Sequence, residues 1–284
     1  MKPNKLKRTL TLIGTALFIL ILGYAALRPF HLRWGASAED LARSMPGDLS
    51  GARWTRAVSI GAAPEAIWPW LLQFGQGRGG WYSYDWLENL LGFDIHTADQ
   101  IVPEFQNPQV GTPICMSGSV CPSKVHVIKP YQWFGWQAAG EDGRPVWTFV
   151  FGLFPEDATH TRLVVRESFD PTFMPAAAVV AMEIPDTVTE LKMLDTLKAR
   201  AEGRGSSAAV TLLEILSWLA ALGIFGTAGV LYIRRAQGLP FLAVSLATVV
   251  VLVLISFLFL PLWLRALLDL GLLAGLVVSL RRAA

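Results

Sequence analysis

The residue types that most often carry out chemistry are sparse in this chain of 284 residues. Its four histidines are His31, His96, His126 and His160, and none has a second histidine three or four positions away, the spacing by which one helix face offers two metal ligands. The nucleophile elbow Gly-x-Ser-x-Gly is not found either. The sequence therefore predicts no metal site and no cofactor, and it nominates no catalytic residue.

Two pairs of charged residues are the remaining candidates for polar chemistry. Asp85 and Glu88 stand three residues apart on a predicted helix and could act as an acid and a base beside a pocket, although a solvated helix face is the favoured interpretation. Arg166 and Glu167 are neighbours in a predicted strand, so they point to opposite faces and one of them should be buried. Because a buried charge needs a partner, a structural ion pair is favoured over a ligand clamp.

The two cysteines, Cys115 and Cys121, are separated by five residues. This spacing suits a disulfide across the tip of a hairpin. A zinc pair is disfavoured because structural zinc takes four ligands. Two free thiols remain the alternative.

Four long apolar runs indicate a membrane protein. Hydrophobic residues make up 53% of the chain and charged residues 16%, against about 25% charged residues in an average soluble protein. The first run resembles a signal peptide, but no small-residue cleavage site follows it at the proper distance, so an uncleaved anchor is favoured. Because a span needs about 20 apolar residues, transmembrane helices are predicted at 9–27, 208–233, 239–261 and 262–280.

Basic residues flank one side of these predicted spans. They lie in the N-terminal segment 1–8, at Arg234 and Arg235, and in the tail 281–284. Since basic flanks stay on the cytoplasmic side, both termini are expected in the cytoplasm and the soluble domain outside it. Between 28 and 208 the chain holds 15 basic and 20 acidic residues, and this acidic balance argues against nucleic-acid binding.

Within the last predicted span and the turn before it, Arg265 and Asp269 stand four residues apart. They should therefore pair on one helix face. A role in ion or substrate handling is the alternative, because charges inside a membrane are functional candidates.

Local patterns between the spans predict a mixed α and β domain. A connector over 28–50 precedes a strand over 53–60 and a helix opened by Pro64. A long helix over 175–202 should end the domain, with Pro185 as a candidate break. Turn signals separate four further strands, at 124–129, 131–138, 146–153 and 161–169.

Smaller features lie between the first helix and these strands. The glycine-rich stretch 75–80 follows a helix instead of opening one, so it is not a phosphate-binding loop. Ser83 should cap a short helix that ends at Gly92. A second short helix is expected over 97–106.

The order of these elements is accompanied by local matches at 57–68, 127–130, 134–136, 147–149 and 161–163. With them, residues 51–203 resemble the START/polyketide-cyclase (SRPBCC) superfamily. The resemblance implies an α+β, helix-grip domain, in which a curved antiparallel sheet wraps around a long C-terminal helix, here with α-helical transmembrane segments added. It also implies an apolar cavity that binds lipids, sterols or polyketides, while a minority of members are cyclases or hydrolases.

Strand alternation then suggests which side chains line such a cavity. Trp133 and Trp136 point to opposite faces of their strand; parity does not choose between them, and Trp136 is taken as the lining residue. A rim is expected from the segment that follows the first helix. The predicted ligand-binding residues are Val58, Ile60, Trp70, Phe74, Trp81, Tyr84, Trp86, Trp136, Trp147, Phe149 and Phe151.

These expectations favour a membrane-anchored protein that binds, and transfers, a lipid or other hydrophobic small molecule without transforming it. One alternative is a cyclase- or hydrolase-like enzyme that uses the same cavity. Another is a membrane-tethered interaction or sensory module. Convergent acids and bases inside the domain would favour the enzyme, and a filled interior with an exposed apolar patch would favour the module.

Overall fold

The chain divides into two compact units. The computed structural model describes residues 4–118, 120–172, 175–205 and 208–282. One unit comprises residues 1–31 with 207–284, and the other comprises residues 32–206.

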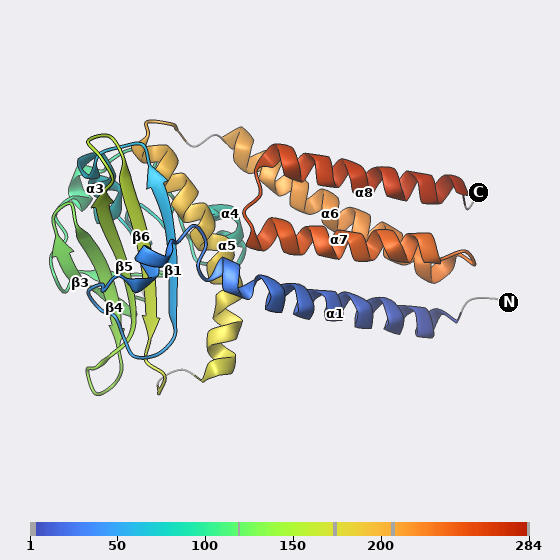
Figure 1. Ribbon diagram of the computed structural model, residues 1–284, viewed down its shortest axis with the longest axis horizontal. Helices are drawn as coiled ribbons and strands as arrows, with labels where there is room; N and C mark the ends of the chain where they lie inside the picture. Colours follow the sequence, from blue (N-terminus) through green and yellow to red (C-terminus); the bar gives the residue numbers. More distant parts are fainter. Residues whose placement is uncertain (1–3, 119, 173–174, 206–207, 283–284) are drawn as a thin grey trace. The chain divides into compact units, whose positions relative to one another are not determined.

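The first unit is helical and consists of α1 (Lys5–His31), α6 (Ala208–Arg234), α7 (Leu239–Phe257) and α8 (Leu262–Arg282) (Figure 1). All four helices are long and apolar enough to cross a membrane. At 1.5 Å per residue, even the 19-residue α7 spans about 29 Å, close to the thickness of the hydrocarbon core. The classification as a membrane protein is therefore supported. Within this unit, α7 is in contact with both α1 and α6.

The expected pairing of Arg265 with Asp269 is wrong. Arg265 Nε donates instead to the carbonyl of Leu260 at 2.8 Å. Ser217 on α6 donates to Asp269 Oδ2 at 2.6 Å, and neither Asp269 Oδ1 nor Arg265 Nη1 has a hydrogen-bond partner among the described residues. Positions i and i+4 share a helix face, but the unpaired carbonyl just before α8 and the hydroxyl of a neighbouring helix offer other partners.

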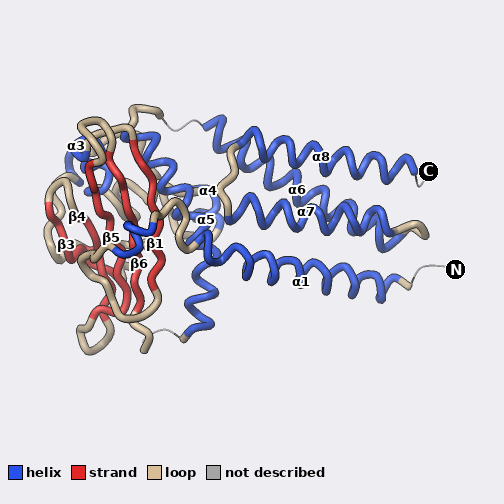
Figure 2. The backbone as a smooth tube through the Cα atoms, in the orientation of Figure 1, coloured by secondary structure: helices blue, strands red, loops and turns tan. Residues whose placement is uncertain are grey.

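The second unit contains a six-stranded sheet in which every neighbouring pair is antiparallel, in the order β1-β6-β5-β4-β3-β2 (Figure 2). Together with the long helix that follows the last strand, this confirms the predicted α+β class and helix-grip arrangement. The two-residue strand β2 was not predicted. The strands are β1 (Arg53–Ile60), β2 (Pro113–Ile114), β3 (Ser123–Lys129), β4 (Trp133–Ala139), β5 (Pro145–Pro155) and β6 (Thr161–Phe169).

One face of the sheet, here called the α5 face, is covered by α5 (Ala176–Ala201) and α3 (Pro64–Leu72). Helix α5 runs without a break through Pro185, so the candidate interruption there is wrong. Proline removes a single helix hydrogen bond. The wholly buried side chains of Leu191, Leu194 and Leu197, from the same helix, hold it to the sheet despite that loss.

The opposite face of the sheet is covered by the segment predicted as a connector, which contains the short helix α2 (Ala38–Ala42). Arg166, almost fully buried, donates to the carbonyls of Asp40 and Arg43 at 2.7 and 2.5 Å. It also forms an ion pair with Asp48 at 3.1 Å. The expected structural ion pair of Arg166 is thus present, and it fastens the segment to the sheet. This side of the sheet is called the α2 face below.

Two local predictions between α3 and β2 are wrong. Helix α4 (Asp85–Leu90) starts after Tyr84 without a side-chain cap, so Ser83 is not its capping residue. The segment 97–106 forms only a 3₁₀ turn at Pro103–Phe105. Short segments of this kind have few internal hydrogen bonds, and tertiary contacts decide their conformation.

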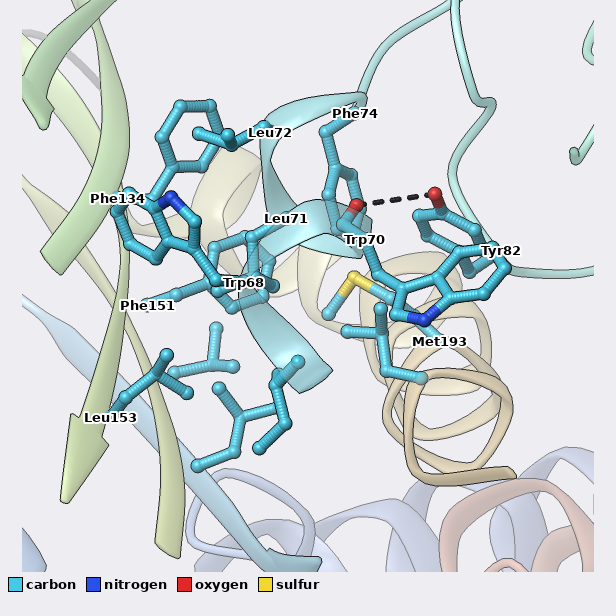
Figure 3. Close-up of a cluster of buried hydrophobic side chains, with 14 of the residues drawn as sticks. Trp68, Trp70, Leu71, Leu72, Phe74, Tyr82, Phe134, Phe151, Leu153 and Met193 are labelled. Carbon is cyan, nitrogen blue, oxygen red and sulfur yellow. Dashed lines mark hydrogen bonds between the residues drawn. The ribbon is translucent and has the colours of Figure 1, made fainter. Parts of the chain in front are cut away.

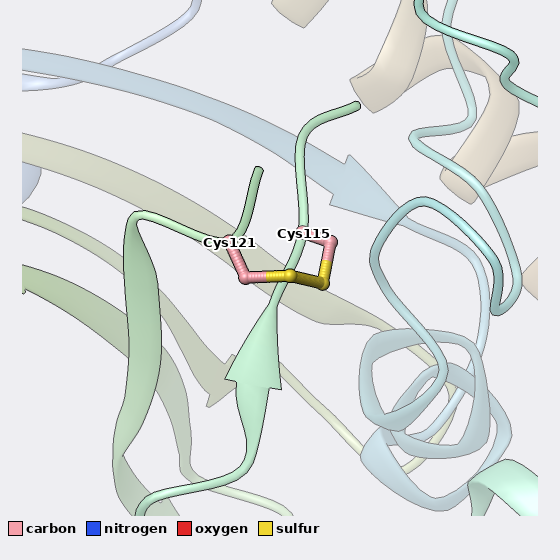
Figure 4. The surroundings of a disulfide bond; sticks show 2 residues. All are labelled: Cys115 and Cys121. Atoms are coloured by element: carbon pink, nitrogen blue, oxygen red, sulfur yellow. A yellow bond between two sulfur atoms is a disulfide. The ribbon is translucent and has the colours of Figure 1, made fainter. Parts of the chain in front are cut away.

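Cys115 and Cys121 form a disulfide just after β2 (Figure 4). The bond closes a loop of few residues beside the edge strand of the sheet.

Candidate functional site

The α5 face of the sheet carries a continuous cluster of buried apolar side chains, called here the aromatic cluster (Figure 3). Strand alternation places every second residue of a strand on this face. Thus β4 contributes Phe134 and Trp136, and β5 contributes Phe149 and Phe151. Trp133 faces the α2 side, where it packs against Phe154. Of the two tryptophans on β4, Trp136 is therefore the one that faces α5, a choice that strand alternation alone could not make.

The rings of this cluster fill the space between the sheet and the two helices. Trp136 stacks on Phe149 with ring centroids 4.6 Å apart and an angle of 5° between the planes. The ring of Phe74, just after α3, has its centroid 4.9 Å from that of Tyr82 and 5.0 Å from that of Phe151. Two surface pockets of the described chain lie elsewhere, along α1 and between α6 and α8. The side chains of the aromatic cluster thus pack directly against one another.

Nine of the eleven predicted ligand-binding residues belong to the aromatic cluster or pack against it. Tyr84 and Trp86 are not among them: their rings pair with each other at 6.3 Å, and Trp86 is 36% exposed. The nine are Val58, Ile60, Trp70, Phe74, Trp81, Trp136, Trp147, Phe149 and Phe151.

The loop after α3 closes one side of the cluster. Tyr82, fully buried, donates from its hydroxyl to the carbonyl of Trp70 at 3.1 Å (Figure 3). Trp81, partly buried, lies 5.7 Å from Trp136. The turn requires glycine at Gly80, where φ is +79° and a Cβ atom would stand 2.7 Å from Thr97 Cα. The glycine-rich stretch therefore shapes the cover of the aromatic cluster.

A second group of side chains lies on the same face and is ionisable. It consists of Glu167 on β6 with Asp186 and Glu190 on α5, called here the carboxylate trio, together with Arg56 on β1. Arg56 Nη1 donates to Asp186 Oδ2 at 2.9 Å and also to Glu190 Oε2. Its Nη2 donates to Thr187 Oγ1 at 2.9 Å.

Burial governs the proton affinity of the two glutamates of the trio. It raises the pKa of Glu167 well above the usual range, and the nearby charges of Asp186 and Glu190 add to that shift. Burial also raises the pKa of Glu190 to about 7, although Arg56 opposes the shift. Glu190 can therefore hold and release a proton near neutral pH, and the oxygens of the trio are of the type that bind hard cations.

Trp147 joins the two groups. Its ring lies 6.3 Å from that of Phe149 in the aromatic cluster, and its Nε1 donates to Glu167 Oε2 at 2.7 Å. An apolar wall thus ends at a small set of convergent polar groups, the composition found in small-molecule sites.

The carboxylate trio was not predicted from the sequence. Of its members only Glu167 was considered, as a charged strand residue whose side chain could face either side of the sheet. Two signals were present. Arg56 lies in a strand whose same-face neighbours are Trp54, Val58 and Ile60, and an arginine in such a row needs buried acids opposite. Asp186 and Glu190 follow at positions i and i+4 of a helix predicted to pack on that strand.

The favoured interpretation of Asp85 and Glu88 as a solvated pair is wrong. Asp85 accepts from both the backbone N–H and the hydroxyl of Thr97 at 2.7 Å. Glu88 is 8% exposed. Its burial, with a smaller contribution from Asp85, raises its pKa to about 7. Asp85 thus holds the loop before the 3₁₀ turn Pro103–Phe105 against α4.

No family model matches the chain, and no curated protein matches it. Among 46 matching chains of known structure is protein MLL2253 from Mesorhizobium loti, 19% identical over 52% of this chain and 97% of that chain, with a TM-score of 0.31. Protein Ms6760 from Mycobacterium smegmatis is 16% identical over 57% and 95%, with a TM-score of 0.31. The Polyketide_cyc-like protein Cgl2372 from Corynebacterium glutamicum is 18% identical over 55% and 91%, with a TM-score of 0.29. Similarities this low carry no argument about ligand or activity.

Proposed function

We propose that this protein is a membrane-anchored binding protein for a lipid or another hydrophobic small molecule, which it holds between the sheet and α5. One observation carries the proposal: nine side chains from β1, α3, the following loop, β4 and β5 converge on a single aromatic cluster that ends at the carboxylate trio. Ligand sites have this combination of apolar walls and few polar groups.

Because the rings of the aromatic cluster contact one another, a ligand must displace side chains to enter. The partly buried Trp81 is the natural entrance, since it lies on a loop and covers Phe74 and Trp136. Loops open at lower free energy than packed strands or helices. Because the apolar helices would anchor the domain at the membrane, the bound molecule could be transferred to or from the bilayer.

The experiment is photo-crosslinking of the full-length protein in membranes with a diazirine fatty acid. Crosslinks on peptides that contain Phe74, Trp81 or Phe149 support the proposal. Crosslinks confined to α1, α6, α7 and α8 would show ordinary lipid contact with the spans and would overturn it. The double variant Phe149→Leu, Phe151→Leu should keep the fold and change which fatty acids are captured. The matched control is Phe154→Leu, on the α2 face, which should capture the wild-type set.

A protein-interaction module is the second candidate, and an exposed apolar patch favours it. The patch is on and after α4, where Leu90 is 77%, Leu91 65% and Phe93 40% exposed. If no fatty acid reaches the interior while substitution of Leu90 and Leu91 by Asn abolishes association with a protein captured in vivo, this second function replaces the first.

The proposed orientation places both termini in the cytoplasm and the domain in the exported compartment. The Cys115–Cys121 disulfide supports it, because disulfides persist in oxidising compartments.

A further inference from the structure

The carboxylate trio brings three acidic side chains from two elements to one point. One oxygen each of Glu167, Asp186 and Glu190 lies within 4.8 Å of the other two. Glu167 is 2% and Glu190 4% exposed, whereas the Asp186 side chain is 21% exposed. The group is thus buried on the sheet side and reachable from solvent at Asp186.

The charges of this group do not balance. Across the described residues, the ion pairs of the trio are those of Arg56 with Asp186 and with Glu190. When all three carboxylates are ionised, one guanidinium leaves two negative charges without compensation. Since uncompensated buried charge is unfavourable, the group needs either protons or a further cation.

Glu167 supplies an independent sign that a positive group belongs at this point. Its Oε2 accepts the hydrogen bond from Trp147, but no N–H or hydroxyl group of the described residues donates to its buried Oε1, whose polar neighbours are the other two carboxyl groups. Buried carboxylate oxygens are normally satisfied by a donor or a metal ion. Here the unsatisfied oxygen belongs to a side chain aimed at two other carboxylates.

We infer that the carboxylate trio is the binding site of a hard divalent cation of the Ca²⁺ class. Three oxygens no more than 4.8 Å apart lie within about 2.8 Å of a common centre, close to the Ca²⁺–oxygen distances of about 2.3–2.6 Å. A divalent ion with Arg56 would balance the three carboxylates. The all-oxygen ligand set favours such an ion over zinc or copper, which prefer nitrogen and sulfur. Protons are the competing occupants. The inference stands whether or not the aromatic cluster takes a ligand.

Terbium(III) is a suitable probe because it replaces Ca²⁺ and emits when a nearby indole transfers energy to it. Trp147 is hydrogen-bonded to Glu167 and should act as that donor. The full-length protein is titrated at pH 8 in nonionic detergent, where anionic lipid headgroups provide no sites. We expect saturable, indole-sensitised emission at one ion per chain, displaced by Ca²⁺ and not by K⁺.

Three variants separate the trio from other acids. Glu167→Gln and Asp186→Asn should each weaken binding at least tenfold, and because Asp186 is partly exposed its variant should fold even if the first does not. Trp147→Phe should lose the emission while calorimetry still detects Ca²⁺. The matched control Asp142→Asn, in an exposed turn, should bind as the wild type does. Absence of saturable binding by folded wild-type protein would overturn the inference, as would unchanged binding by both folded trio variants, and protons would then be the occupants.

Discussion

Trp147 and Glu167 are hydrogen-bonded to each other across the neighbouring strands β5 and β6, Nε1 to Oε2, at 2.7 Å. Phe149 stands directly opposite Glu167 in the register, so Trp147 reaches it along the diagonal on the α5 face. Diagonal neighbours on one sheet face are within reach of long aromatic side chains. This one bond connects the apolar and the ionisable parts of the proposed site.

Trp147→Phe should therefore destabilise the domain by about 1–3 kcal/mol, because the ring remains while a buried carboxylate loses its donor. Thermal unfolding of the full-length protein, followed by near-ultraviolet circular dichroism, measures the change. Trp133→Phe on the α2 face is the matched control and should cost less, since Trp133 packs through its ring against Phe154. Equal losses in the two variants would contradict the role given to the hydrogen bond.

The stability of the domain should fall as the pH rises from about 5 to about 8. Burial raises the pKa of Glu190 to about 7 and that of Glu167 in the same direction. Across this window the unfolded chain ionises these acids first, so it binds fewer protons than the folded chain and becomes favoured. Glu88, with its pKa also raised to about 7, adds a slope of the same sign. Acids with a lowered pKa, such as Asp157 at about 2, lose their contribution only at lower pH.

Glu190→Gln should flatten the dependence of the midpoint temperature on pH, measured in buffers of equal ionic strength without divalent ions. Glu88→Gln should flatten it independently, because Glu88 lies on α4 and outside the trio. If the midpoint temperature of the wild-type protein rose between pH 5 and pH 8, the buried acids would not be the groups that determine how its stability depends on pH.

Removal of the disulfide should have a modest effect. Cys115→Ser with Cys121→Ser opens a short loop, so the loss should be at the low end of the usual range, about 2 kcal/mol. Thiol labelling of the unreduced, denatured wild-type protein should find no free thiol. Two labelled cysteines per chain would contradict both the bond and the exported location.

The orientation of the protein can be read with paired reporters. A reporter active only in the exported compartment should work when fused after Glu202, and one active only in the cytoplasm should work after Arg282. The basic flanks of the spans are the reason. Cytoplasmic activity after Glu202 would reverse the proposed topology.

Arg166 should be far more important to the domain than its position in an ordinary strand suggests. Arg166→Met removes the donors that hold the carbonyls of Asp40 and Arg43 and leaves the Asp48 carboxylate without this partner. We expect a loss of about 3–5 kcal/mol, as for other broken buried pairs, and early proteolysis within 36–48. Arg144→Met, in an exposed turn, should change stability by less than about 0.5 kcal/mol. Equal protease resistance of the two variants would show that the segment is held by other contacts.

The sequence alone determined the four long apolar helices, the positions of the main strands along the chain and the face to which most strand residues point. These features depend on the spacing of apolar residues, which repeats about every 3.6 residues in a helix and every 2 residues in a strand. This spacing can be seen from residues close together in the sequence. The alternation of β5 correctly grouped Trp147, Phe149 and Phe151, and helical spacing grouped Trp70 with Phe74.

Only the tertiary structure decided which buried charges meet. Arg56 and Glu190 are 134 residues apart, and no local period relates them. A pattern shows that a side chain faces inward, but its partner depends on how α5 lies along the sheet. For the same reason Pro185 was only a candidate break and Arg265 was paired with Asp269, whereas contacts with other segments prevailed over local preference. The carboxylate trio exists because α5 packs against the sheet. This packing places Asp186 and Glu190 of the helix opposite Arg56 and Glu167, which lie on the adjacent strands β1 and β6.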